Sequence, residues 1–330
     1  RPIIDEIALV EFVERHAQAT GQVRVLPAAT ITKGMGGLEM TEFGLLMEAG
    51  AVLFTDGYKS IVNAQVMRRA LSYASNFNAL ISHHTEVPEL VGDGVMNDGE
   101  TATRLGLSGI PGIAETIMLE RDIRIVELTG GRYHASSIST ADSVAVVRRA
   151  KDKGLQVTCG VAPYHFALNE NEVGHYRTFA KVSPPLRSER DREAIVEGLA
   201  DGTVDVIASH HRPEDPEAKR LPFAQAAYGA VGLETLWPIS LELYHKGQVS
   251  LLDLLARLTL GPATILGLPQ GRLARGAPAD LLIFDADTPS RIDAATFQSK
   301  SKNSPFDQRP VQGRVMRTVV SGATVYEQRS

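Results

Sequence analysis

The residues best suited to chemistry are histidines that follow short apolar runs. His84 ends one run and stands two residues before Glu86, and His210 ends another. An imidazole at the end of a strand can bind a metal ion or carry a proton near neutral pH. Each has a histidine neighbour, His83 and His211, and adjacent residues of a strand point to opposite faces. No His-x-His spacing occurs in the 330 residues, so no two histidines are spaced to share one strand face.

Two further side chains could take part in such chemistry. Asp56 ends the apolar run AGAVLFTD, where a carboxylate can hold a cation or cap the next helix. Cys159 is the one cysteine of the chain, which excludes an internal disulfide and favours a reducing cytoplasm. Because it lies within the apolar run VTCGVAP, we interpret Cys159 as a buried strand thiol rather than a nucleophile.

Short apolar runs alternate with longer helical patterns along most of the chain. The predicted strands are 23–29, 51–56, 79–84, 132–139, 157–163 and 204–211. The predicted helices are 39–49, 64–76, 113–128, 141–153, 189–200 and 230–246. Strands separated by helices predict βαβ units and a parallel sheet. Such units favour an α/β fold, a (β/α)₈ barrel whose first units lie upstream of Arg1. The alternative is an open doubly wound sheet, although no GxGxxG follows a strand.

The C-terminal stretch has a different pattern. Residues 271–287 and 313–327 predict short strands joined by Gly turns. We therefore expect two units, a β/α barrel over residues 1–268 and a small β-sandwich appendage over residues 269–330. The chain begins with Arg1 rather than Met, and we expect a segment of the native protein to precede it.

Composition excludes several classes of partner. Apolar residues make up 43% and charged residues 22% of the chain, as in a soluble globular protein. A net charge of −5 gives no basic surface for nucleic acid or an anionic membrane. No apolar run reaches the ~18 residues of a membrane-spanning helix. We expect a cytoplasmic protein that binds neither nucleic acid nor membranes.

Several stretches resemble bacterial dihydroorotases, which are cyclic amidohydrolases. They are LPAATITKG (26–34), GVMNDGETATRLGLSGIPGIAE (94–115), SPPLRSERDREAIVEGLADGTVDVIAS (183–209), GAVGLET (229–235) and GAPADLLIFDAD (276–287). The resemblance implies a TIM-like (β/α)₈ barrel of the metal-dependent hydrolases with a one-zinc or two-zinc site. It also implies the reversible cyclisation of N-carbamoyl-aspartate to dihydroorotate. In that chemistry a metal-bound hydroxide attacks the ring carbonyl and an aspartate moves the proton.

The resemblance assigns the family's metal-binding positions to residues that match it only in part. Asp56 keeps one carboxylate of the family's TDDG or SDDG, whereas Gly57 replaces the second. His84 matches a metal-binding histidine, and Glu86 is retained. Ser137 falls on a zinc-binding histidine, and a serine hydroxyl is a poor substitute for imidazole at zinc. We therefore expect zinc if any metal is bound, and no intact binuclear site.

The catalytic and substrate positions implied by the resemblance also differ. His210 falls on the catalytic Asp of the family's T-D-H-A-P-H. Ser183 falls on a substrate-binding Asn, and Glu214 on a substrate-binding His. An anionic Glu214 would disfavour a substrate carboxylate through like-charge repulsion. Gly229 and Ala230 begin GAVGLET, a loop that touches the substrate ring in the family and whose glycines allow close backbone approach.

These substitutions affect metal binding, proton transfer and substrate recognition independently. Our main interpretation is a dihydroorotase-like protein of pyrimidine biosynthesis with degenerate sites. It would be a non-catalytic partner of aspartate carbamoyltransferase within a homo- or hetero-oligomer. The alternative is an active dihydroorotase or related amidohydrolase that combines His84, Asp56, His165 and His210 with ligands from an upstream segment. A third interpretation is a small-molecule sensor that keeps the pocket without turnover.

Overall fold

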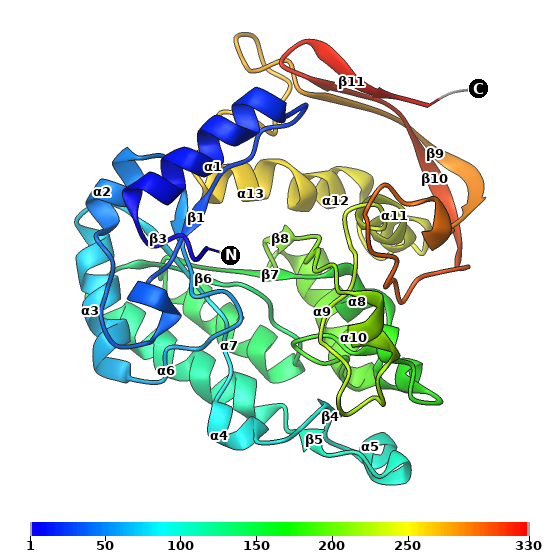
Figure 1. Cartoon of the computed structure of the whole chain (residues 1–330), viewed down its shortest axis with the longest axis horizontal. Helices are drawn as coiled ribbons and strands as arrows, with labels where there is room; N and C mark the ends of the chain where they lie inside the picture. Colours follow the sequence, from blue (N-terminus) through cyan, green and yellow to red (C-terminus); the bar gives the residue numbers. More distant parts are fainter. Residues whose placement is uncertain (1, 329–330) are drawn as a thin grey trace.

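A computed structural model describes residues 2–328, and its centre is a sheet of six parallel strands (Figure 1). They are β1 Ala28–Ala29, β2 Leu53–Phe54, β3 Leu80–His83, β6 Arg132–Ala135, β7 Val157–Val161 and β8 Val206–Ile207. Their order in space, β1-β2-β3-β6-β7-β8, follows the chain without reversing. That is the order of a β/α barrel, whereas a doubly wound sheet reverses at a central crevice. The predicted barrel-type fold is therefore confirmed for these strands.

Helices cover the outer side of this sheet (Figure 1). They include α1 Ile7–Thr20, α2 Phe43–Glu48, α3 Ala64–Ser75, α6 Ile113–Thr129, α7 Ala141–Asp152, α9 Glu189–Asp201, α11 Leu236–His245, α12 Leu251–Leu258 and α13 Leu260–Ile265. Neighbouring helices pack together, α3 on α6, α6 on α7 and α7 on α9. Side chains cap several starts: Asn63 accepts from Val66 N, and Ser188 accepts from Asp191 N. Each cap fixes the point at which a loop becomes a helix.

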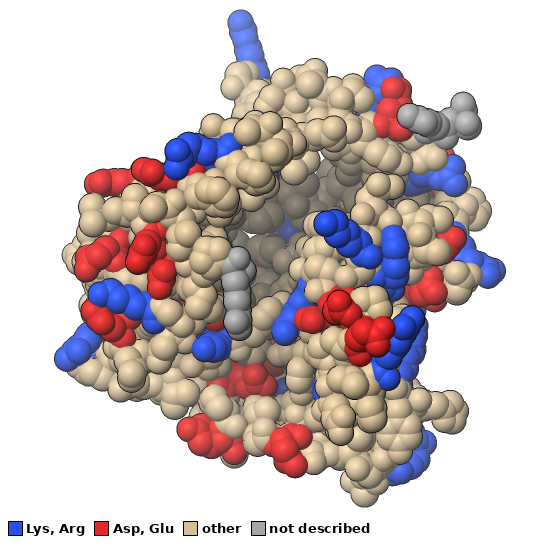
Figure 2. All heavy atoms as spheres, in the orientation of Figure 1, with Lys and Arg blue, Asp and Glu red and all other residues tan. Residues whose placement is uncertain are grey.

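The strands are buried because helices lie on one side and the interior of the barrel on the other. Ile81, Tyr133, Cys159 and Val161 have no exposed surface and belong to one apolar core. Cys159 is thus a buried strand thiol as expected, and burial raises the pKa of its thiol. Within residues 2–328, β1 and β8 are the edge strands of the sheet. Figure 2 shows that the molecule is deeply hollowed at its centre.

An excursion between β3 and α6 was not predicted. It contains α4 Pro88–Val91, β4 Met96–Asn97, α5 Glu100–Leu105 and β5 Gly109–Ile110, with β4 parallel to β5. Arg187 anchors it to the barrel, because its Nη1 donates to Asn97 Oδ1 at 3.0 Å and to the Ile110 carbonyl oxygen at 2.6 Å. Elements of two to six residues are too short to leave a periodic pattern in the sequence.

The C-terminal appendage is a three-stranded antiparallel sheet in the order β11-β10-β9. Its strands are β9 Leu281–Arg291, β10 Pro310–Val320 and β11 Ala323–Glu327. The Trp237 ring of α11 packs on Phe284 of β9, with ring centres 4.4 Å apart. The expected sandwich is one sheet within residues 2–328, and Leu281, Leu282 and Ile283 stay exposed. The boundary between residues 268 and 269 stays a prediction.

Every strand and helix predicted from the sequence has a counterpart, although most are shorter than predicted. The helix predicted over 230–246 begins only at Leu236, because the preceding residues form a loop that joins the end of β8. There Ala230 bridges His211, and a Cβ at Gly232 would lie only 1.9 Å from the Ser209 carbonyl oxygen. No helix within residues 2–328 is long and apolar enough to cross a membrane.

Candidate active site

The carboxyl ends of the parallel strands bring several of the singled-out side chains together. His84 directly follows β3, and Ser137 lies two residues after β6. His165 lies in the short helix α8 Pro163–Ala167 after β7, and its Nδ1 is 3.4 Å from Ser137 Oγ. The Tyr164 ring lies 4.6 Å from the ring of His165 and 6.4 Å from that of His210, between centres. We call His84, His165 and His210 the histidine mouth.

His210 adopts an uncommon backbone conformation at this mouth. Its φ is +43°, in the left-handed region that few residues other than glycine adopt. Its Nε2–H donates to the Ser136 carbonyl oxygen at 3.3 Å, so Nδ1 carries the lone pair, and no hydrogen bond to it occurs within residues 2–328. Burial, with a smaller contribution from His84, lowers the pKa of His210 to about 4. The imidazole is therefore neutral at pH 7.

His165 is held in the same manner. Its Nε2–H donates to the Pro184 carbonyl oxygen at 3.0 Å, so Nδ1 is the acceptor that faces the Ser137 hydroxyl. Burial lowers the pKa of His165 to about 3, although the bond to Pro184 acts in the opposite direction. Ser183, at the family's substrate-binding position, immediately precedes Pro184 and is half-buried.

Asp56 and His84, the other predicted metal ligands, both have protein partners. Asp56 Oδ1 accepts from Ile31 N at 2.9 Å and from Thr32 N at 3.0 Å, and Oδ2 accepts from the Thr32 hydroxyl. The carboxylate thus ties the loop after β1 to the end of β2 instead of capping the next helix. His84 Nε2 lies 2.9 Å from Glu86 Oε2.

The donor set of residues 2–328 does not by itself fit the zinc site that the resemblance implies. No three His, Cys, Asp or Glu side chains in this part of the chain lie close enough together to hold a metal ion. Both oxygens of Asp56 are occupied by donors from residues 31 and 32. The zinc content of the whole protein, and our expectation that it lacks a binuclear centre, stay predictions.

Glu214 has a cationic partner that the sequence did not reveal. Arg212 Nε donates to Glu214 Oε1 at 2.9 Å, and both side chains are partly exposed. The negative charge that we expected to repel an anionic substrate is therefore balanced locally. Arg212 stands two residues after His210 in the sequence. Its pairing with Glu214 could not be predicted, because the path of the loop and not the spacing decides which side chains pair.

The loop that begins at Gly229 is fixed by the C-terminal part of the chain. Asn303 is 3% exposed. Its Nδ2 donates to the Gly229 carbonyl oxygen at 3.1 Å, and its Oδ1 accepts from Glu214 N at 3.4 Å. Its own carbonyl oxygen accepts from Val231 N at 3.1 Å. Ala230 is buried, and its carbonyl oxygen accepts from Arg212 N at 2.8 Å.

A buried polar network lies directly behind His84. Asp122 of α6 is fully buried, and its Oδ2 accepts from His83 Nδ1 at 2.6 Å and from the Tyr133 hydroxyl at 2.8 Å. Its Oδ1 accepts from Arg121 Nη2 at 2.6 Å. His83 Nε2 in turn accepts from Ile61 N at 2.8 Å. The two adjacent histidines therefore point to opposite sides, as a strand requires, and only His84 faces the mouth.

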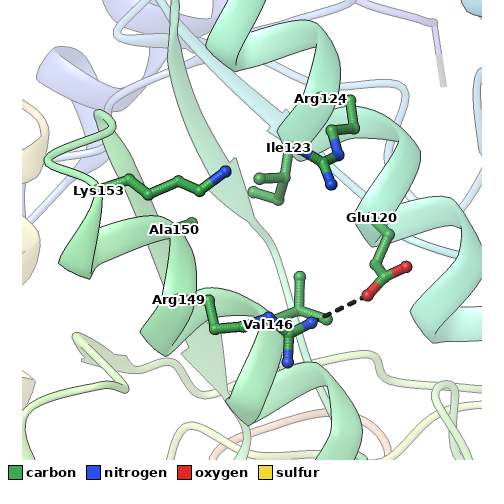
Figure 3. A pocket seen from close by; sticks show the side chains of 7 residues that line it. All are labelled: Glu120, Ile123, Arg124, Val146, Arg149, Ala150 and Lys153. Carbon is green, nitrogen blue, oxygen red and sulfur yellow. Dashed lines mark hydrogen bonds and ion pairs between the residues drawn. The ribbon is translucent and has the colours of Figure 1, made fainter.

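A second hollow lies on the outer helices, away from the strand ends. It is a groove between α6 and α7 lined by Arg149, Glu120, Lys153 and neighbours (Figure 3). Arg149 Nη2 lies 2.9 Å from Glu120 Oε1, and Lys153 pairs with Glu127. Because these charges are paired with one another, we assign the groove no catalytic role.

Comparison with known proteins identifies the family. A family model described as Dihydro-orotase-like matches residues 2–143, and one described as Amidohydrolase family matches residues 129–326. The dihydroorotase of Wolbachia sp. subsp. Drosophila simulans (strain wRi) is 46% identical over 100% of this chain and 74% of its own length. The chain belongs to the dihydroorotase family. The dihydroorotase of Desulforapulum autotrophicum is 43% identical over 99% of this chain and 76% of its own length.

Solved structures agree on the fold of this dihydroorotase-family chain. The L-hydantoinase (dihydropyrimidinase) of Arthrobacter aurescens superposes with a TM-score of 0.87 and 26% identity. The match covers 100% of this chain and 76% of that one. A D-hydantoinase superposes with a TM-score of 0.82 at 20% identity, which supports the fold alone. The barrel predicted from the sequence is therefore that of the amidohydrolases.

We expect the fold to lose stability as the pH falls from about 6.5 toward 4. The unfolded chain takes up a proton at His165 below about 6.5, whereas the folded chain resists until about 3. Stability from this group is therefore complete above 6.5 and decreases by about 1.4 kcal/mol per pH unit below it. Urea unfolding at several pH values would measure the slope.

The variant His165→Gln keeps a side-chain donor for Pro184 but does not titrate. The decrease of its unfolding free energy with falling pH should therefore be smaller by about 1.4 kcal/mol per pH unit. The matched control is His16→Gln on the exposed surface of α1, which should leave the slope unchanged. Equal slopes for the wild type and His165→Gln would contradict the prediction.

Proposed function

We propose that this chain, within its full-length protein, catalyses the reversible ring opening of dihydroorotate to N-carbamoyl-aspartate in pyrimidine biosynthesis. The observation that carries the proposal is that His84, His165 and His210 follow three strand ends, with Tyr164 between the rings of His165 and His210 and with His84 near enough to act on His210. Relatives that are 43–46% identical and named dihydroorotase support it. We prefer the active enzyme to the non-catalytic partner, because His84 and His210 each use one ring nitrogen in a hydrogen bond, and no hydrogen bond within residues 2–328 engages the other.

In this proposal His210 moves the proton. A water molecule adds to the ring carbonyl carbon, and its proton passes to the lone pair of His210 Nδ1. The ring C–N bond then breaks, and the same proton passes from Nδ1 to the leaving nitrogen. The low pKa of His210 keeps the imidazole neutral and ready to accept at pH 7. A strained backbone at this residue supports a functional role, since left-handed non-glycine residues cluster at active sites.

The test is an assay of the full-length protein with dihydroorotate and, in the reverse direction, with N-carbamoyl-aspartate. We expect turnover at ordinary enzyme rates, a kcat of roughly 1–10³ s⁻¹. Circular dichroism confirms that the sample is folded. A folded protein without measurable turnover in either direction would contradict the proposal.

A non-catalytic partner of aspartate carbamoyltransferase is the second candidate. It is favoured by Asp56, whose carboxylate is occupied by the loop after β1, and by Ser137 at the family's zinc-binding histidine position. The same preparation is mixed with the transcarbamoylase and sedimented. Association without turnover supports this candidate, and a partner present at 100 times its Kd would stabilise the complex by about 2.7 kcal/mol. Oligomeric state and a cytoplasmic location stay predictions.

A further inference from the structure

Arg212 places a cation beside the histidine mouth. Its guanidinium carbon lies 4.4 Å from the centre of the Tyr58 ring, and that ring lies edge-on to His84 with centres 6.1 Å apart. Burial raises the pKa of the Tyr164 hydroxyl, and Arg212 is near enough to offset part of that rise. Tyr164 contacts both His165 and His210, so Arg212 faces the same space as the histidines.

The guanidinium has two protein partners. Nε donates to Glu214, and the group lies over the Tyr58 ring, within hydrogen-bonding reach of the Tyr58 hydroxyl. Within residues 2–328, Nη1 and Nη2 donate to no carboxylate or carbonyl oxygen. These two terminal groups form the planar fork that binds a carboxylate through two parallel hydrogen bonds. The Arg212 side chain is 34% exposed, so a ligand can reach the fork.

The surrounding charges favour an anion. Lys219 is 2% exposed, and its Nζ donates to the Ala227 carbonyl oxygen at 2.8 Å. Burial lowers the pKa of Lys219 to about 8, with Glu214 and Arg212 near enough to act on it in opposite directions. Two basic groups, Arg212 and Lys219, therefore lie near the carboxylate of Glu214.

The backbone of Arg212 is fixed from the facing loop. Its N–H donates to the Ala230 carbonyl oxygen at 2.8 Å. Gly229 adopts a φ of +136°, and a Cβ there would lie 2.7 Å from Arg212 Cγ. Only glycine lets the two segments pass so closely, which accounts for this residue in the GAVGLET loop.

We propose that Arg212 binds the carboxylate of the substrate and thereby selects cyclic amides that carry a carboxylate over uncharged ones. This inference rests on the proposed function, because it assigns recognition at the same mouth. From its residue type alone, Glu214 was expected to repel the substrate. Instead it holds the Arg212 side chain through Nε and leaves Nη1 and Nη2 without a carboxylate partner within residues 2–328.

The experiment uses the full-length protein and the variants Arg212→Ala, Arg212→Gln and Arg212→Lys. Calorimetry measures the Kd for orotate, a carboxylate-bearing ring that the reaction does not open, and for dihydrouracil, which lacks the carboxylate. We expect Arg212→Ala and Arg212→Gln to weaken orotate binding roughly 10–100-fold, as loss of a charged hydrogen-bonding partner does. Dihydrouracil binding should stay within about twofold, and Arg212→Lys should recover part of the orotate affinity.

Steady-state kinetics provide a second readout, since the KM for dihydroorotate should rise while kcat changes by less than about threefold. The matched control is Arg220→Ala in α10 Pro216–Arg220, an exposed arginine paired with Glu217 that should behave as wild type. Equal weakening for orotate and dihydrouracil, or no weakening of either, would overturn the assignment. Wild-type protein that binds orotate through Arg212 but shows no turnover would support the role of Arg212 in carboxylate binding and contradict the proposed function.

Discussion

Replacing His210 by alanine should lower the kcat for dihydroorotate hydrolysis by about 10²–10⁴-fold, the usual contribution of a positioned proton-transfer group. The change in KM should be small, because the substrate carboxylate is assigned to Arg212 and not to His210. The reason is geometric, since Nε2 is fixed on Ser136 and Nδ1 alone is left to exchange the proton. Stopped assays of purified variants at saturating substrate would measure the loss.

The control for this prediction is His16→Ala, the same change at an exposed histidine of α1. A pH profile supplies a further check. The base form of His210 is the neutral one, so kcat/KM should fall as the pH decreases toward about 4, and His210→Ala should lose that limb. Activity of His210→Ala within threefold of wild type would assign proton transfer to another group.

Replacing Asp122 by alanine should cost about 3–5 kcal/mol of unfolding free energy, the range seen when one partner of a buried ion pair is removed. The substitution leaves His83 Nδ1, the Tyr133 hydroxyl and Arg121 without their shared acceptor, in a site with no solvent exposure. Urea unfolding followed by circular dichroism gives the free energy directly.

The matched control for Asp122 is Asp201→Ala, which removes an aspartate paired with Arg148 where both side chains are 43% exposed. That change should cost no more than about 1 kcal/mol. Burial acts to raise the pKa of Asp122, but His83 and Arg121 outweigh it and hold the pKa below its ordinary value. Its stabilisation is thus complete above the unfolded pKa and is lost only as the pH falls through the lower folded value. A loss below 1 kcal/mol for Asp122→Ala would show that the network is dispensable.

The fold was predictable because its determinants are local and repeated. Runs such as AVLF (51–54) and VDVIA (204–208) are largely apolar, and apolar strands separated by helices leave few arrangements besides a parallel sheet. The excursion around β4 and β5 was not predicted, because its elements are very short and contacts such as that of Arg187, ninety residues away from Asn97, are not visible in the local sequence.

The strand ends that carry the candidate residues could be predicted from the sequence, but the hydrogen-bond and ion-pair partners of those residues could not. Parallel strands deliver their carboxyl ends to one mouth, and His84, His165 and His210 lie after the ends of three of them. Their part in the chemistry stays a prediction. The partner of Asp56 lies in the preceding βα loop, and the partner of Glu214 lies two residues away on a turn. Such pairings depend on the path of the loop, about which residue type and spacing carry no information. For this reason the sequence analysis treated Glu214 as an unpaired charge, whereas Arg212 pairs with it.

Asn303 shows that the two predicted units share one mouth. This residue belongs to the stretch 269–330, yet it holds both the turn that carries Glu214 and the loop that begins at Gly229, which belong to residues 1–268. Glu234 adds a further contact between the two stretches, because its carboxylate accepts from the backbone N–H groups of Gln298 and Ser299. A cut after residue 268 would therefore separate Asn303 and Gln298 from the segments that they contact, and would divide the proposed substrate site. In chimaeras between relatives, residues 207–235 and 298–306 should accordingly be exchanged together, because these two segments hydrogen-bond to each other.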